Sequence, residues 1–137
     1  MWWIYALLSA LFAALTAVFA KIGIKNVDTD LATAIRTVVV LILAWAIAFF
    51  RGGTNSIPSL TKQNILFLAL SGVATGLSWI FYFKALQLGK ISQVAPIDKL
   101  SVALAIIFSI VFLGETLTLK TALGAICIIG GTIIIIL

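Results

Sequence analysis

The sequence predicts an all-α integral membrane protein built as a bundle of five transmembrane helices. Hydrophobic residues make up 64% of the 137 residues and charged residues 9%, and the mean hydropathy is +1.29. Such a chain has too little polar surface to cover a soluble domain. Five apolar stretches each match the roughly 17 to 25 residues that cross a bilayer, and the longest polar stretch runs only from Arg51 to Asn64. A single five-helix membrane domain is therefore expected over residues 1–137.

Short polar connectors separate the apolar stretches and set the limits of the expected helices. The connectors carry Gly, Pro, Asn, Asp or Lys, which favour turns and boundaries between membrane and water. The expected helices run from Trp2 to Ala20, Leu31 to Phe50, Ile65 to Leu86, Val94 to Leu113 and Thr121 to Leu137.

The first two stretches carry aromatic residues at matching ends. Trp2, Trp3 and Tyr5 open the first stretch, and Phe49 and Phe50 close the second, so they are expected to form part of an aromatic belt at one membrane face. The first stretch lacks the positive n-region of a signal peptide, and its apolar run of about nineteen residues exceeds the usual h-region. We therefore expect it to remain as a helix in the mature protein.

Polar residues recur at helical spacing on three of the expected helices. Because lipid offers no hydrogen bonds, such polar stripes usually face protein or a water-filled cavity. The alternative is that the hydroxyls bond to their own backbone carbonyls and serve as small packing residues. The second stretch is polar only in its first turns and the fifth only at its edges, so both are expected to be peripheral. The stripes are Tyr5, Ser9, Ala13 and Thr16 on the first helix, Ser71, Thr75, Ser78 and Tyr82 on the third, and Asp98, Ser101, Ala105 and Ser109 on the fourth.

The charged pair Asp98 and Lys99 follows Pro96 in the fourth stretch. If the helix begins near Ser92, the proline interrupts its first turns and Asp98 lies about 9 Å inside, at a functional position. If the helix begins at Pro96, the proline occupies its favoured first position and Asp98 is an ordinary first-turn carboxylate. The spacing is compatible with both interpretations.

Arg36 is the obvious partner for Asp98, because both lie one to two turns from the same membrane side. Charges inside a span cost roughly 2.5 to 3.5 kcal/mol each on insertion scales and need a partner or a use. A pair of Arg36 and Asp98 would leave Lys99 free to meet an anionic ligand. In the alternative, Arg36 and Lys99 extend to the headgroups while Asp98 caps its helix.

The candidate substrate-binding residues are therefore Thr16, Arg36, Ser71, Thr75, Ser78, Tyr82, Asp98, Lys99 and Ser101.

Composition argues against enzymatic chemistry and nucleic-acid binding. The chain has no histidine, four acidic residues and one cysteine, Cys127, which leaves no material for a catalytic metal site or a nucleophile with its base. No cofactor is expected. The nine Lys and Arg residues are spread along the chain, without the cluster that a phosphate backbone would need. The expected partners are the lipid bilayer and a small-molecule substrate.

The number of spans and the distribution of charge bear on assembly. An odd number of spans leaves the termini on opposite sides, so a second copy can form an inverted pair with the first only by inserting upside down. Lys and Arg in or next to the connectors number three on the N-terminal side and four, including Lys84 near the end of the third stretch, on the other. Counting Arg36 and Lys99 raises the second number to six and favours a cytoplasmic C-terminus. The connector count alone suits a chain that inserts both ways.

Three stretches carry a resemblance to a known family: Ala32 to Thr37, Tyr82 to Leu86, and Phe112 to Thr118 with Gly124 just after it. On them the chain resembles the EamA branch of the drug/metabolite transporter superfamily, from end to end. Most relatives carry two five-helix repeats in inverted orientation, whereas this chain looks like the single-repeat form. The resemblance therefore implies one five-helix repeat, an antiparallel homodimer, a substrate cavity between the repeats and alternating access.

The resemblance also bears on individual residues. Phosphate-sugar and nucleotide-sugar carriers of the superfamily bind anionic ligands through basic residues on the fourth helix of a repeat, which favours Lys99. Small multidrug members have four helices and a glutamate in the first, and the first stretch here has no acid. Their proton chemistry is therefore not carried over. Glu115, in the signature stretch, lies at a membrane-edge turn and is expected to be structural.

Together these observations predict a secondary transporter for a small polar or anionic metabolite. The expected location is the cell membrane, as a multi-pass protein of a bacterial or archaeal inner membrane. Two alternatives stay open: a non-transporting membrane subunit of a larger complex, and a lipid-phosphate flippase.

Overall fold

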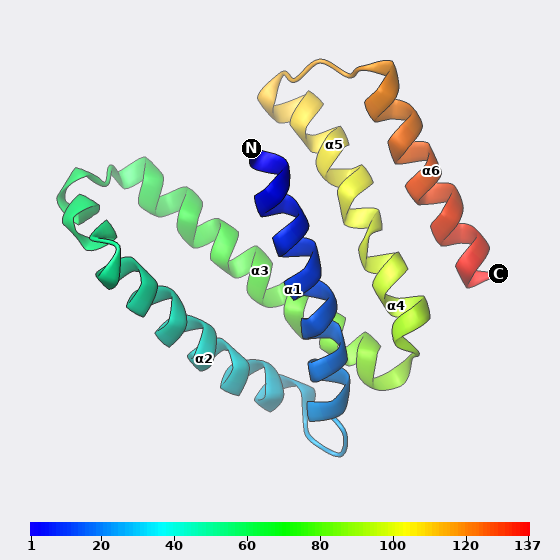
Figure 1. Ribbon diagram of the computed structural model, residues 1–137, viewed down its shortest axis with the longest axis horizontal. Helices are drawn as coiled ribbons and strands as arrows, with labels where there is room; N and C mark the ends of the chain where they lie inside the picture. The colour runs from blue at the N-terminus through cyan, green and yellow to red at the C-terminus, as the bar shows by residue number, and fades with distance from the viewer. The chain divides into compact units, whose positions relative to one another are not determined.

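The computed structural model describes residues 1–137 as α-helices and one 3-10 helix, without strands. Five segments are long and apolar enough to cross a membrane, and α4 and α5 together form one of them, Ile91–Leu113. The predicted all-α architecture with five spans is therefore confirmed. In chain order the elements are α1 (Trp2–Gly23), α2 (Thr29–Phe50), η1 (Gly53–Ser59), α3 (Lys62–Leu88), α4 (Ile91–Asp98), α5 (Leu100–Leu113) and α6 (Leu119–Ile136) (Figure 1).

Polar caps explain why several helices begin before their apolar stretch. The Asp28 Oδ1 atom accepts hydrogen bonds from the backbone N–H groups of Asp30 and Leu31, each at 3.0 Å, so α2 begins at Thr29. The Thr118 Oγ1 atom likewise accepts from a backbone N–H three residues on, at 3.2 Å, and α6 begins at Leu119. Such caps satisfy N–H groups that have no partner within the helix.

Two helices end at glycines in the left-handed conformation. Gly52 has φ 71° after α2, and Gly114 has φ 68° after α5. A residue with a Cβ atom would be strained there, whereas glycine adopts this region at no steric cost. Gly114 belongs to the signature stretch that ends the fourth span. The backbone N–H of the next residue, Glu115, bonds to the Ser109 carbonyl at 3.3 Å and closes the turn.

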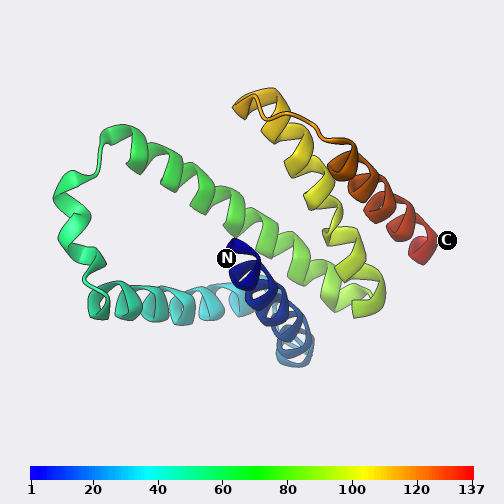
Figure 2. The ribbon, with the colours of Figure 1, turned by 45° about the horizontal axis from the view of Figure 1, so that its top comes forward.

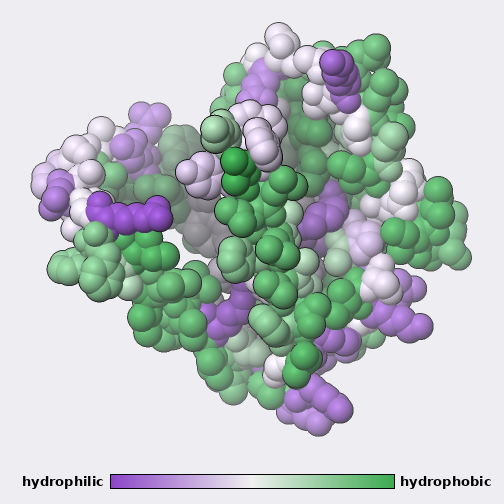
Figure 3. Space-filling model, in the orientation of Figure 1, coloured by the Kyte–Doolittle hydropathy of each residue, from purple (hydrophilic) through white to green (hydrophobic).

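The helices expose their apolar side chains almost everywhere. In the most apolar window of each span, between 0% and 6% of the residues are buried. Figure 3 shows apolar side chains over most of the visible face. A water-exposed surface of this kind would be unstable, whereas helices that satisfy their own backbone hydrogen bonds suit a bilayer. The chain is an integral membrane protein.

The chain divides into two compact units. The terminal unit consists of Met1–Val18 with Leu88–Leu137, and the central unit consists of Phe19–Gln87. The boundary falls within α1. The expectation of a single five-helix domain over residues 1–137 stays a prediction.

In the central unit, hydrogen bonds join the end of α3 to the connector before α2. The Gln87 Nε2 atom donates to the carbonyls of Ile24 and Val27, at 3.3 and 2.9 Å, and the Lys21 ammonium donates to the Leu86 carbonyl. Ile24 and Leu86 are buried. From this hydrogen-bonded end, α2 and α3 diverge towards η1 (Figure 2). The contacts that order this unit therefore lie at one end of the helix pair.

In the terminal unit, α6 packs along α4 and α5 (Figure 1). Val94 of α4 and Ala103 of α5 are buried, and so is the hydroxyl-bearing Thr132 of α6. The Thr132 Oγ1 atom donates to the Ile128 carbonyl of its own helix at 2.8 Å and to the Pro96 carbonyl of α4 at 3.2 Å. The second bond links two helices through a backbone group beside the proline.

Candidate functional site

The fourth span is interrupted at the charged pair. Its helix begins at Ile91, so Pro96 lies inside α4, and Lys99 separates α4 from α5. The Lys99 N–H is shared between the carbonyls of Ala95 and Pro96, at 3.3 and 3.1 Å. Proline has no N–H to give to the carbonyl four residues earlier, which weakens the helix here. The interpretation with a helix start near Ser92 is confirmed, and the alternative with the start at Pro96 is wrong.

Asp98 and Lys99 lie at this interruption and pair with each other. Asp98 ends α4, about 10 Å along the helix axis from its first residue at 1.5 Å per residue. The Asp98 Oδ2 and Lys99 Nζ atoms are 3.5 Å apart, and their side chains are 34% and 56% exposed. The Lys99 ammonium therefore has the neighbouring carboxylate as its counter-ion. A pair of Arg36 and Asp98 would instead have left Lys99 free. The pairing of Arg36 with Asp98 stays a prediction, since the two residues belong to different compact units.

Thr132 is a residue that sequence reasoning missed. Its side chain is 4% exposed, and its hydroxyl reaches the Pro96 carbonyl, two residues before Asp98. The fifth span was expected to be peripheral because it is polar only at its edges. The available signal was a hydroxyl residue that follows Gly130 and Gly131 in an otherwise apolar run. It could have indicated a helix contact at Thr132.

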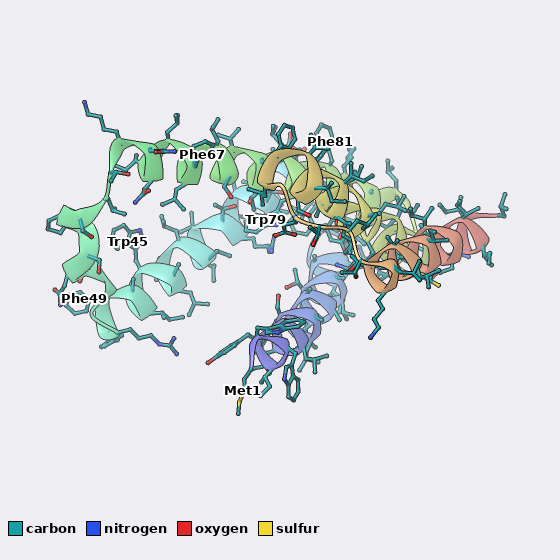
Figure 4. The ribbon with its side chains drawn as sticks, turned by 90° about the horizontal axis from the view of Figure 1, so that it is seen from above. Met1, Trp45, Phe49, Phe67, Trp79 and Phe81 are labelled. Carbon is teal, nitrogen blue, oxygen red and sulfur yellow. The ribbon has the colours of Figure 1, made fainter.

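Arg36 occupies an aromatic environment in the central unit. Its Cζ atom lies 4.2 Å from the centroid of the ring of Trp79, which is labelled in Figure 4, and 4.7 Å from that of Phe83. Both rings come from α3, one turn apart. A cation over an aromatic face gains about 0.5 to 2 kcal/mol, more as water is excluded. The Arg36 Nη1 atom is buried and has no hydrogen-bond partner.

The two rings were not among the predicted site residues. Tyr82 was, and its ring centroid lies 5.8 Å from that of Phe83. Trp79 and Phe83 are spaced by four residues and therefore share a face of α3. An arginine within an apolar stretch needs a counter-charge or an aromatic surface. That need, together with the aromatic spacing, could have indicated the contact.

The polar stripe of α3 is outward-facing over most of its length. Ser71, Thr75 and Ser78 are exposed, and Tyr82 is half-buried. The Thr75 hydroxyl donates to the Ser71 carbonyl at 2.9 Å, as the packing alternative expects. The exposed hydroxyls can still accept hydrogen bonds, so their part in a substrate site stays a prediction.

The remaining candidates lie in the terminal unit. Thr16 of α1 is half-buried, and Ser101, in the first turn of α5, is exposed. Further along α5, the Ser109 hydroxyl bonds to the Ile106 carbonyl at 2.9 Å. Ser101 lies two residues beyond Lys99, near the interruption of the span. Substrate contacts by Thr16 and Ser101 stay predictions.

Comparison with known proteins identifies relatives in three organisms. An "uncharacterized transporter in cobO 3′region" from Sinorhizobium sp. is 49% identical over 134 residues, which cover 98% of this chain and 95% of that protein. An uncharacterized protein of Methanocaldococcus jannaschii is 38% identical over 77 residues, 56% of each chain. The human solute carrier family 35 member G1 is 32% identical over 127 residues, which cover 91% of this chain and 34% of the human protein. No solved structure is significantly similar.

The model of the EamA-like transporter family matches residues 1–137. Together with the relative named as a transporter over nearly the same length, this match supports a membrane transporter rather than an enzyme. The five apolar spans and the short connectors agree with that class. The chain belongs to the EamA-like transporter family.

Proposed function

We propose that the protein is a secondary transporter that moves a small polar or anionic metabolite by alternating access, as an antiparallel homodimer. The observation that carries the proposal is the interruption of the fourth span at Asp98 and Lys99. Ionisable residues within a span are costly and usually mark a transport pathway. Interrupted helices are also a recurrent feature of transporter binding sites.

The geometry of the Asp98–Lys99 pair allows Lys99 to exchange its carboxylate partner for an anionic substrate. Its 3.5 Å separation is longer than the 2.7 to 2.9 Å of a strong charge-assisted hydrogen bond. Both side chains are partly exposed, so an anionic group can approach Lys99 and compete with Asp98. Protonation of Asp98 would remove the competing charge. In this scheme Lys99 binds the anion and Asp98 couples binding to a proton.

The exposed apolar surface and the number of spans favour an inverted dimer. Each span leaves nearly all of its apolar window uncovered by its own chain, so a second copy can bury part of it. With five spans, the two copies form an inverted pair only if they insert in opposite orientations. The count of Lys and Arg near the connectors, three against four, becomes even when the N-terminal amine is added to the N-terminal side, and is compatible with both orientations.

Reconstitution into liposomes tests transport directly. Uptake of a panel of labelled amino acids and small carboxylates is measured for the wild type and for Lys99→Ala, which we expect to insert normally but to lose uptake. Lys90→Ala is the matched control, because Lys90 lies before α4 and its side chain makes no capping hydrogen bond. Wild-type uptake by Lys99→Ala would defeat the assignment of Lys99.

Mapping both termini tests assembly. A tag is placed at each end and probed from outside intact cells. Each tag should be accessible in one part of the molecules and protected in the rest. Crosslinking of purified protein should give dimers. A single orientation would contradict the antiparallel dimer. A monomer that binds nothing and always copurifies with another protein would favour the subunit alternative, and movement of labelled phospholipid would favour the flippase.

We place the protein in the cell membrane, the inner membrane of a bacterium or archaeon. The relatives in Sinorhizobium and Methanocaldococcus jannaschii support this location. Fractionation of cells with an antibody to the protein checks it, and recovery outside the inner membrane would contradict it.

A further inference from the structure

The guanidinium of Arg36 has aromatic contacts, but its buried Nη1 atom has no hydrogen-bond acceptor. Trp79 and Phe83 lie 4.2 and 4.7 Å from its Cζ atom, and the Nη1 atom is buried without a partner. Ring faces attract the positive charge, yet they do not replace the acceptors that the five N–H donors require. A buried donor left unpaired is destabilising. The rings therefore hold the guanidinium in place and leave the Nη1 donors without an acceptor.

The acidic groups on the same helix do not compensate this charge. The carboxylate of Asp28 is engaged as the cap of α2, where it accepts two backbone N–H groups. Asp30 precedes Arg36 by six residues, which places it about 240° around the helix. The hydroxyls of Thr33 and Thr37 donate to carbonyls of their own helix. Lys99 differs in this respect, since Asp98 lies 3.5 Å from it.

We propose that Arg36, held by Trp79 and Phe83, is the anchor of a binding site for the carboxylate of a monocarboxylate. The proposal rests on the transport function proposed above and deepens it by naming the class of substrate. It assigns a carboxylate contact to Arg36, separate from the anion contact proposed above for Lys99, which already has Asp98 as a counter-ion. Lys99 remains at the interruption of the fourth span, where its pairing with Asp98 is exchanged during transport.

Charge balance favours a carboxylate over a phosphate. One guanidinium and one carboxylate form a neutral pair, which is tolerated in a medium of low dielectric constant. A phosphate monoester carries about −1.5 to −2 charges at pH 7 and would leave a net negative charge. The planar fork of the guanidinium also matches the two oxygens of a carboxylate. The Trp79 side chain is half-buried and offers an apolar surface to the remainder of the ligand, whereas Phe83 is fully buried and supports Arg36.

Tryptophan fluorescence can report on this site without any transport assay. The chain has four tryptophans, Trp2, Trp3, Trp45 and Trp79. Replacing the first three by phenylalanine leaves Trp79 as the single reporter, adjacent to the guanidinium. The full-length protein in nanodiscs of neutral lipid is titrated with sodium butyrate at constant ionic strength. We expect a saturable change in Trp79 emission, and no change with the uncharged isostere butyramide.

Variants at Arg36 test whether the change in Trp79 emission reports binding at the guanidinium. In the same background, Arg36→Gln should abolish saturable binding. Arg36→Lys keeps the charge but loses the fork, and it should weaken butyrate binding at least tenfold. Arg36→Lys keeps a cation beside the rings and should fold even if Arg36→Gln does not. Circular dichroism will check the helix content of both variants. Arg51→Gln is the matched control, since Arg51 is exposed just beyond the end of α2. It should bind as the parent does.

Four results would overturn the proposal: no saturable response to butyrate, an undiminished response in Arg36→Gln, binding of inorganic phosphate as tight as that of butyrate, or displacement of butyrate by phosphatidylglycerol at equal concentration. The last would assign the site to a lipid headgroup. The failure of this site is distinguishable from the failure of the transport function. If butyrate binds but is not taken up by liposomes, the carboxylate site at Arg36 stands and the transport function fails. If uptake persists in Arg36→Gln but needs Lys99, the transport function stands and the site at Arg36 fails.

Discussion

Replacing Thr132 by valine should loosen the contact of α6 with the interrupted fourth span. The substitution keeps the shape of the side chain and removes its hydroxyl, which donates to the carbonyls of Ile128 and Pro96 at 2.8 and 3.2 Å. The first bond lies within α6, whereas the second crosses to α4. Thr132 is buried, so lipid and water do not replace the lost group.

The expected magnitude follows from the bond between the helices. Hydrogen bonds between transmembrane helices contribute on average about 0.6 kcal/mol and at most about 1.7 kcal/mol. The unfolding equilibrium constant of Thr132→Val should therefore rise by roughly threefold to sixteenfold, since 1.4 kcal/mol is a factor of ten. Thr75→Val is the control, because Thr75 loses only a bond within its own helix.

Reversible unfolding in mixed micelles, driven by sodium dodecyl sulfate and followed by circular dichroism, measures the difference between the two variants. Thr132→Ser, which keeps the hydroxyl, should recover most of the lost stability. If Thr132→Val is as stable as Thr75→Val, or if Thr132→Ser is no better than the valine variant, then the bond to Pro96 does not hold α6 in place.

Three further predictions concern charged and polar groups at helix ends. Asp98→Asn removes the titratable partner of the fourth span, so uptake by liposomes should lose its dependence on an imposed pH gradient; unchanged dependence would exclude Asp98 as the coupling group. Asp28→Ala removes both capping hydrogen bonds of α2 and should lower the free energy of unfolding by about 1 kcal/mol in the micelle assay. Asp28→Asn is the control and should lose less of the free energy of unfolding. Equal stability of Asp28→Ala and the wild type would contradict the capping role. Gln87→Leu removes the bonds to the carbonyls of Ile24 and Val27, so amide exchange in residues 24–28 should accelerate; exchange at the wild-type rate would show that this connector is ordered by other contacts.

The limits of the helices show how far a hydropathy pattern extends. The apolar stretch beginning at Leu31 indicated the second span, but the helix starts at Thr29 because Asp28 caps it. In the same way Thr118 moves the start of α6 from the predicted Thr121 to Leu119. A cap is polar and lies outside the apolar run. Hydropathy therefore locates the span, whereas local hydrogen bonds locate its first residue.

Pro96 illustrates a choice that spacing alone left open. Proline suits the first turn of a helix and is also found inside membrane helices, where it weakens the hydrogen-bond ladder. The sequence is compatible with both, and the structure places Pro96 within α4, before an interruption at Lys99. The contact with Thr132 of α6 supplies a donor to the Pro96 carbonyl. That donor comes from a distant part of the chain, so no local pattern could indicate it.

The sequence by itself determined the membrane class, the five spans and the inventory of charged side chains, because hydropathy and span length are properties of consecutive residues. Only the tertiary structure decided what surrounds the guanidinium of Arg36, because the rings of Trp79 and Phe83 that lie beside it come from α3. Helical periodicity shows which residues share a face, but the partner of that face depends on packing between helices that are distant in sequence.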